Sequence, residues 1–412
     1  MILLQRYIAF IFLLLGIPVT AGTLIVSPDG PVYSVKAALE QAAAGDTILV
    51  RAGVYKEYNL LIDKPVTLMG EGLPVIDGED QGEIIRVVAD NVHIEGLLIR
   101  NVGTSYTSDH AAIRMVRCEN FLIKNMVFEK LFFGIFLEKS NKGIISGNKI
   151  TGDATDEYSS GNGIHLWYSH EVKVLDNSVE GVRDGIYLEF SDHILIKDNT
   201  SKGNLRYGLH FMFSNNDTYI NNVFKDNGAG VAVMFSKHIK MFDNHFLKNW
   251  GTASFGLLLK EINDSEIKGN VFEQNTVGIN IEGSNRVHYD SNDFISNGWA
   301  VKVLGACYTN IFTRNNFLSN SFDVSYNNSM NDNTFHGNYW SEYTGYDLNK
   351  DGVGDVPYRP VKLFSYVVNR TPETLVLLRS LFVDMIDFSE KVSPVFTPDA
   401  LVDATPLIKR RK

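Results

Sequence analysis

Histidine and methionine side chains stand at fixed offsets from a glycine that recurs through the middle of this 412-residue chain. His210 and Met212 lie two and four residues after one copy of the glycine, Met234 lies four residues after the next copy, and His165 lies two residues after an earlier copy. Imidazole nitrogen and thioether sulfur together suit soft metal ions, above all Cu(I). The pattern therefore predicts a copper contact at these four residues. An apolar patch that contacts a protein partner is the alternative.

A second group of candidate metal ligands follows the last copy of the repeat, in the segment DLNKDGVGD. Asp347, Asn349, Asp351 and Asp355 place side-chain oxygens around a glycine, as calcium-binding loops do. Tyr358 stands where an EF-hand carries its twelfth-position glutamate, so the segment resembles shorter loops of the DxNxDGxGD type. It predicts a calcium site. The alternative is an Asp/Gly turn held by its own hydrogen bonds.

The glycine belongs to a repeat whose copies are mostly 22 or 23 residues apart. An asparagine follows the glycine after fourteen residues in the clearest copies, at Asn148, Asn177, Asn199, Asn222, Asn244, Asn270 and Asn292. A short fixed period of this kind indicates a solenoid. Asparagine at a repeated corner fits this interpretation, because its side chain tolerates the left-handed turn conformation and can hydrogen-bond to a neighbouring backbone.

The pattern inside one copy indicates which solenoid forms. In the segment GLHFMF, the apolar Leu209, Phe211 and Phe213 alternate with His210 and Met212, which is the period of a strand with one buried face. Two further short apolar segments complete each copy. Three short strands in each turn of about 22 residues predict a right-handed parallel β-helix. The candidate copper ligands are then expected to be exposed on its outer face.

The repeat predicts one elongated β-helix domain over residues 22–339. Residues 1–21 contain one early cation, an apolar run and a small-residue cleavage pattern, which predict a secretory signal peptide and an exported protein. Ser34–Ala44 is helix-forming and is expected to cap the first turn. Residues 340–412 form a C-terminal extension with the Asp/Gly-rich loop and an amphipathic helix expected from Thr371 to about Glu390. This helix either closes the solenoid or docks on another protein or a membrane.

Composition and charge exclude several functions. The formal net charge of −10 argues against sequence-independent nucleic-acid binding, which needs a positive surface. The chain has no GxxxxGK[ST] phosphate loop, so we expect ATP chemistry to reside elsewhere. Polysaccharide hydrolysis needs neighbouring carboxylates, whereas Glu138, Glu189 and Glu282 occur several turns apart on the outer columns. We therefore expect no enzyme. The alternative is an extracellular carbohydrate-binding or polysaccharide-cleaving β-helix protein.

Three segments carry a resemblance to a known family. They are RYGLHFMFSNN from Arg206, FGLLLKEINDSEIKGN from Phe255, and the long stretch beginning HGNYWSEYTGYDLNKDGVGD at His336. Together they resemble the NosD family of periplasmic accessory proteins, which serve the maturation of nitrous-oxide reductase. The C-terminal stretch is far more specific than the β-helix repeat, and the resemblance runs from the signal peptide to near the C-terminus.

The resemblance implies a non-enzymatic periplasmic role in denitrification. It implies that the chain works with an ABC transporter, made of a cytoplasmic ATPase and a membrane permease, in assembling the copper centres of nitrous-oxide reductase. A copper chaperone and the reductase itself are the further partners that it implies. It leaves open whether copper, sulfur or both are handled, and it strengthens the expectation of transient copper contact at His210, Met212 and Met234.

Overall fold

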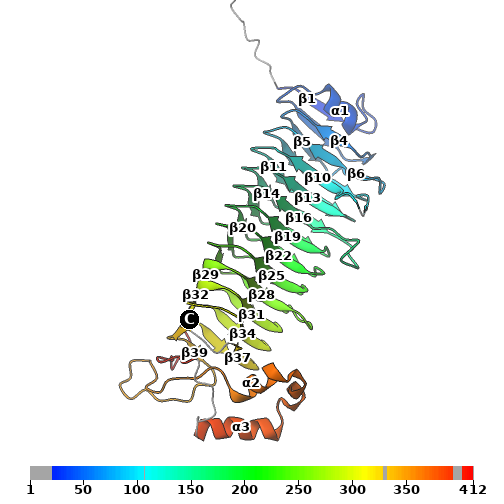
Figure 1. Ribbon diagram of the computed structural model, residues 1–412. Helices are drawn as coiled ribbons and strands as arrows, with labels where there is room; N and C mark the ends of the chain where they lie inside the picture. The colour runs from blue at the N-terminus through cyan, green and yellow to red at the C-terminus, as the bar shows by residue number, and fades with distance from the viewer. Residues whose placement is uncertain (1–20, 106, 328–331, 393–400, 412) are drawn as a thin grey trace, which may run out of the picture.

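The computed structural model describes residues 21–105, 107–327, 332–392 and 401–411. The chain forms an elongated solenoid of three parallel sheets, with one short helix at the N-terminal end and further helices at the C-terminal end (Figure 1). The predicted parallel β-helix is therefore confirmed. The predicted signal peptide lies almost wholly in residues 1–20, outside the described residues.

Successive turns of the chain add one strand to each sheet, and neighbouring strands pair in parallel. Sheet I contains β1 (Thr23–Val26), β2 (Thr47–Arg51), β5 (Thr67–Glu71), β8 (His93–Glu95), β11 (Leu122–Lys124), β14 (Ile144–Ser146), β17 (Lys173–Leu175), β20 (Leu195–Lys197), β23 (Thr218–Ile220), β26 (Lys240–Phe242), β29 (Asn263–Lys268), β32 (Asn285–Asp290), β35 (Ile311–Thr313) and β38 (Thr334–His336). Sheet II contains β4 (Leu60–Ile62), β7 (Ile85–Val87), β10 (Ala111–Val116), β13 (Phe133–Glu138), β16 (Ile164–Trp167), β19 (Asp184–Glu189), β22 (Tyr207–Met212), β25 (Ala229–Met234), β28 (Phe255–Lys260), β31 (Val277–Glu282), β34 (Trp299–Leu304) and β37 (Phe322–Tyr326). Sheet III contains β3 (Val54–Lys56), β6 (Val75–Asp77), β9 (Leu98–Arg100), β12 (Val127–Glu129), β15 (Lys149–Thr151), β18 (Ser178–Glu180), β21 (Thr200–Lys202), β24 (Val223–Lys225), β27 (His245–Leu247), β30 (Val271–Glu273), β33 (Asp293–Ile295), β36 (Asn316–Leu318) and β39 (Tyr339–Trp340).

Strand β22 shows how the repeat builds the core. Leu209 and Phe211 are fully buried, as predicted, and pair in register with Val231 and Val233 of β25. Phe213 departs from the predicted alternation. The strand ends one residue earlier, at Met212, and Phe213 adopts the left-handed turn conformation with a φ of 52°, which leaves the residue 39% exposed. The chain turns a corner at this residue, so its side chain points away from the core.

The corner asparagines form a buried ladder along the solenoid. Asn222 donates from Nδ2 to Oδ1 of Asn244 at 2.9 Å and to a backbone carbonyl at 3.0 Å, while its Oδ1 accepts the backbone N–H of Asn199 at 2.9 Å. The ladder continues to Asn338, whose backbone N–H and Nδ2 both donate to Oδ2 of Asp403 at 3.0 Å. Because buried polar groups need partners, each asparagine fixes the position of the next turn.

Helices close the two ends. Helix α1 (Val35–Gln41) covers the first turn, and the Ser34 hydroxyl accepts the Ala37 N–H at 3.2 Å, in line with the predicted cap. The single helix predicted from Thr371 to about Glu390 is wrong. The structure has α2 (Leu363–Arg370), a 3₁₀ helix η1 (Pro372–Leu377) and α3 (Leu381–Val392).

The interruption between η1 and α3 has a local cause. Arg379 adopts a φ of 68°, which a continuous α-helix does not allow. The Thr371 side chain makes no capping hydrogen bond, so the sequence signal for a helix start did not mark one. Within the described residues, no helix combines the length and apolarity that crossing a membrane requires.

Candidate functional site

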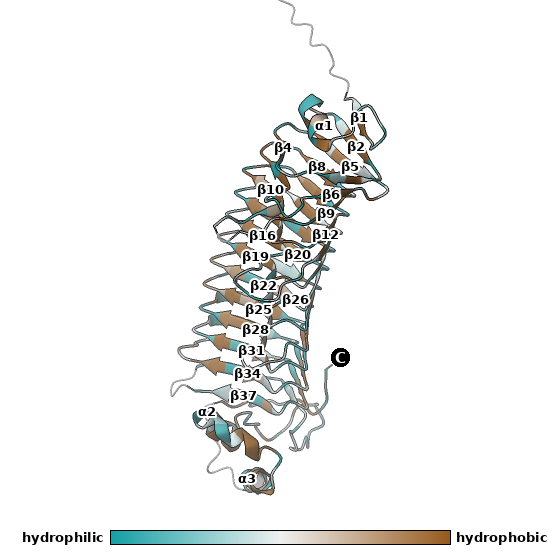
Figure 2. Cartoon of the chain, turned by 90° about the vertical axis from the view of Figure 1, so that its right-hand side faces the viewer, coloured by the Kyte–Doolittle hydropathy of each residue, from teal (hydrophilic) through white to brown (hydrophobic). Residues whose placement is uncertain are grey.

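The predicted copper residues lie on strands of sheet II, which follow one another along the solenoid (Figure 2), and they form two columns. His165, Tyr187 and His210 follow one another in register in strands β16, β19 and β22. In the second column, Met212 pairs with Met234 of β25. The predicted columns are therefore present, and Met212 and Met234 lie one strand spacing apart, about 4.8 Å.

His210 is not exposed, which corrects the sequence-based expectation. Its side chain lies outside the core, yet the residue is only 5% exposed. The rings of Tyr187 and Tyr207 lie 4.6 and 4.7 Å from its imidazole, centroid to centroid. An aromatic side chain of the neighbouring strand β19 and one from the start of its own strand β22 thus cover an outward-facing histidine, and strand alternation alone does not reveal such a cover.

The buried imidazole of His210 stands in a polar cluster with unsatisfied atoms. Neither ring nitrogen of His210 has a hydrogen-bond partner among the described residues, and Nδ1 lies 3.7 Å from Oδ2 of Asp184. Asp184 is fully buried and pairs with Nη2 of Arg206 at 3.2 Å. Its other carboxylate oxygen and Nε of Arg206 are also unpartnered. Buried polar atoms without partners are costly, so this cluster marks a candidate ligand site.

The two thioethers remain more accessible than the imidazole. Met212 and Met234 are both partly exposed at the ends of their strands. The Tyr187 hydroxyl donates to Sδ of Met212 at 3.6 Å, and the Tyr187 ring stacks on His210. Tyr187 therefore links the thioether to the buried histidine. His210 and Met212 lie two residues apart on β22, and Met234 pairs with Met212 from β25, so the structure places all three at neighbouring positions of sheet II.

His165 does not join this group, because the Tyr187 ring lies between the two histidines. Its imidazole lies 4.6 Å from Tyr187 and 4.4 Å from Phe136, centroid to centroid, and the residue is 7% exposed. Burial, followed by the nearby Arg183 and Arg114 charges, lowers the pKa of His165 to about 3. The imidazole is therefore neutral near pH 7. Burial also raises the pKa of Glu189, which stands beside Met212 in the second column.

A partly exposed aromatic stack borders the methionines, and the sequence analysis did not predict it. Tyr168, Phe190, Phe213 and Phe235 each follow the last residue of a sheet II strand and stack with centroid distances of 4.7, 5.1 and 5.0 Å. All four adopt the left-handed turn conformation, with φ between 49° and 55°. The signal was an aromatic residue five places after four consecutive repeat glycines, of which the alternation had assigned Phe213 to the core.

The predicted calcium loop uses its carboxylates within the turn. Asp347 accepts the backbone N–H groups of Asp351 and Gly352 at 3.2 and 2.9 Å, and Asp355 accepts that of Leu348 at 2.7 Å. Asn349 donates to Asp351 at 3.0 Å. This arrangement fits an Asp/Gly turn held by its own hydrogen bonds, and calcium binding stays a prediction. Over the described residues, no three His, Cys, Asp or Glu side chains converge to hold a metal ion.

Comparisons with known proteins agree with the resemblance seen in the sequence. A family model described as "Periplasmic copper-binding protein (NosD)" matches residues 146–345. A protein of Stutzerimonas stutzeri named "Probable ABC transporter binding protein NosD" is 28% identical over 378 residues, which cover 87% of this chain and 86% of that protein. Its namesake from Pseudomonas aeruginosa is 28% identical over 370 residues, covering 85% and 86%. The resemblance to the NosD family is confirmed.

Solved structures with low sequence identity share the fold. A family 28 exopolygalacturonase of Yersinia enterocolitica has a TM-score of 0.56 at 11% identity, covering 76% of this chain and 78% of that chain. PfbA, a surface adhesin of Streptococcus pneumoniae, also has a TM-score of 0.56 at 11% identity, covering 76% and 88%. An enzyme and an adhesin thus share this β-helix, so the fold alone does not indicate a function.

Proposed function

Because the chain is related to the NosD family over most of its length, we propose that it is a periplasmic component of an ABC-transporter complex that assists copper-centre assembly in nitrous-oxide reductase. The ATPase, the permease, a copper chaperone and the reductase are its proposed partners. The observation that carries the copper part is the pairing of Met212 with Met234 on adjacent strands, two residues along β22 from His210, whose imidazole has no hydrogen-bond partner among the described residues.

Copper is the cargo in this proposal, and the residues present suit it chemically. Thioether sulfur and imidazole nitrogen prefer Cu(I) over hard cations. Met212 and Met234 offer two sulfurs on adjacent strands, and His210 offers a nitrogen that no protein group occupies. Because His210 is covered by Tyr187 and Tyr207, the thioethers are the first groups that an incoming ion would meet. A contact of so few soft ligands suits transfer better than storage.

We propose a non-enzymatic role for the same face. Trp167 stands between Glu138 and Glu189 in the second column, so these two carboxylates do not lie on adjacent strands. Glu282 lies farther along, in β31, beside Lys260 of the preceding strand. Polysaccharide hydrolysis by two carboxylates needs them close to one glycosidic bond. The partly buried methionine pair offers no substitute for that chemistry.

Cu(I) titration of a methionine variant tests the proposed contact. Met212→Leu combined with Met234→Leu removes both sulfurs while nearly conserving side-chain volume, so the free energy of unfolding should change by less than about 1.5 kcal/mol. We expect Cu(I) affinity, measured by competition with a chromogenic chelator, to fall about tenfold or more. Met69→Leu, a partly exposed methionine on sheet I, is the matched control. His210→Gln is the weaker test, because substituting a buried, stacked ring also disturbs packing.

Unchanged Cu(I) binding in the double variant would refute the copper contact at this face. Copper occupancy of the reductase, measured after coexpression, provides a second readout. If occupancy falls while Cu(I) affinity does not, the face serves as a partner surface and not as a copper contact.

We also propose that α3 docks on the transporter. Val383 packs with Phe364 and Val368 of α2 against the end of sheet II, so the helix pair helps to close the solenoid. The other side of α3 exposes Leu381, Phe382, Met385 and Phe388, each at least 58% exposed. A contiguous exposed apolar surface of this kind is typical of a contact site.

Copurification tests this docking. Phe382→Ser combined with Phe388→Ser should leave thermal unfolding nearly unchanged and reduce recovery of the permease. Trp250→Ser, which changes an exposed aromatic residue far from the helices, is the control. Full recovery of the permease with the double variant would refute docking through α3.

A further inference from the structure

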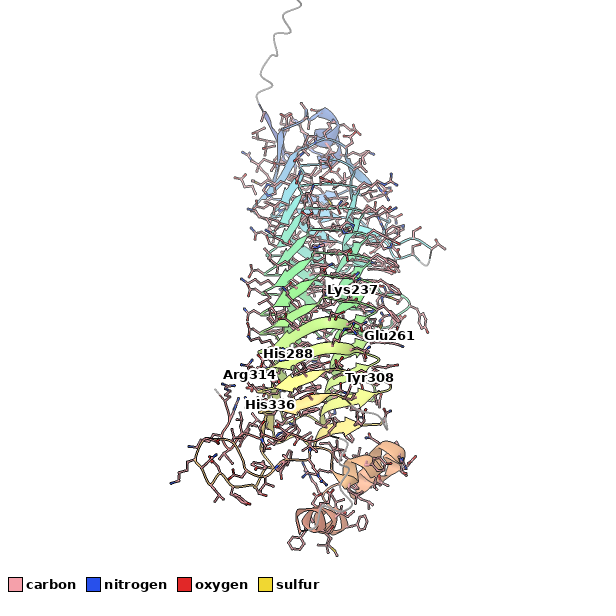
Figure 3. All side chains as sticks on the ribbon, turned by 60° about the vertical axis from the view of Figure 1, so that its left-hand side comes forward. Lys237, Glu261, His288, Tyr308, Arg314 and His336 are labelled. Carbon is pink, nitrogen blue, oxygen red and sulfur yellow. The ribbon has the colours of Figure 1, made fainter. Side chains whose placement is uncertain are left out.

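A cationic groove lies beside the last turns of sheet I, where the C-terminal residues fold back along the solenoid. The groove has a volume of about 810 Å³ and opens between strands β32, β35 and β38 and the returning residues 405–411. His288, Arg314 and His336 mark its solenoid side (Figure 3). Neither the copper proposal nor the docking proposal uses this region.

The returning segment is held firmly enough to form a wall. Leu407 donates its N–H to the Asn338 carbonyl at 2.8 Å, and the backbone of Arg411 exchanges two hydrogen bonds with Asn316, at 3.1 and 3.2 Å. Arg410 forms an ion pair with Asp293 at 2.6 Å. These contacts hold the backbone on both sides of Lys409 and the backbone of Arg411 against the solenoid.

The side chains that line the groove are cationic or neutral. Of the residues that the structure describes, His288, Arg314, His336, Lys409 and Arg411 line it, and no Asp or Glu side chain does. Arg314 is paired with Asp290, which lies outside the lining, at 2.6 Å. No ion pair forms at Lys409 or Arg411 within the part of the chain that the structure describes. The groove therefore carries a local excess of positive charge on a chain whose formal net charge is −10.

Each histidine already uses one ring nitrogen on a threonine hydroxyl. Nε2 of His288 lies 2.8 Å from Oγ1 of Thr313, and Nδ1 of His336 lies 2.8 Å from Oγ1 of Thr405. These contacts hold both rings at the groove. The second pair joins the solenoid to the returning segment, so both walls are positioned together.

We propose that this groove binds an oxyanion of the phosphate or sulfate type. The unpaired cations Lys409 and Arg411 supply charge, and Arg presents paired N–H donors that match oxyanion geometry. The threonine hydroxyls are already engaged, since Thr313 donates to Asp290 at 3.0 Å and Thr405 lies 2.8 Å from Nδ1 of His336, so the two cations supply the free donors. The same chemistry would recognise a free ion or the phosphate of a lipid headgroup, and the experiment below separates these two sources.

Calorimetric titration of the full-length protein with inorganic phosphate and with sulfate, in buffer matched for ionic strength with chloride, tests the proposal. We expect saturable binding of at least one ion. Lys409→Ala combined with Arg411→Ala should weaken it about tenfold, because charge-assisted hydrogen bonds are lost. His288→Gln, on the solenoid wall, tests the site independently of the returning segment and should also weaken binding.

Lys240→Gln is the matched control, since Lys240 occupies the same outer column of sheet I two strands before His288. It should bind the ions as the wild type does. Vesicles with anionic phospholipid form a second arm, and sedimentation that depends on Lys409 and Arg411 would identify a headgroup as the source. No saturable binding in either arm, or binding that neither variant changes, would overturn the proposal.

Discussion

Asp403 should hold the returning C-terminal segment to the solenoid, and removal of its carboxylate tests this attachment directly. The residue is fully buried. Its carboxylate accepts the backbone N–H groups of Gly337, Asn338 and Thr405 at 3.2, 3.0 and 3.1 Å. It also accepts Nδ2 of Asn338 at 3.0 Å and the indole N–H of Trp340 at 3.1 Å.

Asp403→Ala leaves those donors without a buried acceptor. A hydrogen bond to a charged group contributes about 1.5–3 kcal/mol, and the contributions of neighbouring bonds are not additive, so we expect a local loss of about 3–5 kcal/mol. At about 1.4 kcal/mol for each factor of ten, amide protection should fall roughly 10²- to 10⁴-fold.

Hydrogen exchange at the Asn338 amide and the Trp340 indole measures this effect directly. The loss should stay near the last turns, because a solenoid is stabilised by contacts between neighbouring turns. Asp293→Ala removes the exposed ion pair with Arg410 and is the control, with an expected effect below about 1 kcal/mol. Unchanged exchange at Asn338 and Trp340 in Asp403→Ala would show that the carboxylate does not anchor the segment.

Three further predictions follow from buried groups and from the aromatic stack. The pKa of His165 is about 3 in the folded state and about 6.5 in the unfolded state, so the unfolded state binds more protons between these pH values. The free energy of unfolding should therefore fall as the pH decreases from about 6.5 to about 3. Urea unfolding of the wild type and of His165→Phe at several pH values measures how the free energy of unfolding depends on pH. Asn222→Ala should cost about 2–4 kcal/mol by urea unfolding, whereas Asn221→Gly, at the exposed neighbouring position with φ of 54°, should cost far less. Phe213→Ser combined with Phe235→Ser should reduce copurification of a periplasmic partner and leave Cu(I) affinity of the isolated protein unchanged.

The sequence predicted the β-helix because its main determinant is periodic. The repeat glycines and the corner asparagines recur at the pitch of the turn, and the structure places Asn222 and its counterparts in one ladder. Strand alternation likewise identified Leu209 and Phe211 as core residues. These features depend on the position of a residue within one turn, and the repeat places the same residue type at that position in successive copies.

Features that depend on contacts between turns or between distant segments could not be predicted in the same way. His210 is buried because Tyr187 and Tyr207 lie beside it, which requires the register of β19 and β22. Asp403 completes the ladder from 65 residues beyond Asn338, and no period marks it. Phe213 was wrongly assigned to the core because a turn residue at positive φ interrupts the alternation where the strand ends.

The two interpretations of the outer face of sheet II, copper contact and partner contact, are compatible in this geometry. Met212 and Met234 immediately precede Phe213 and Phe235 of the partly exposed aromatic stack. A partner that covered the stack would also remove water from around the two sulfurs. Exclusion of water strengthens polar and charged interactions, so an ion held there would interact more strongly with the partner's ligands. The thioethers and the aromatic rings could therefore serve one transfer step, the rings by holding the partner and the sulfurs by presenting the ion.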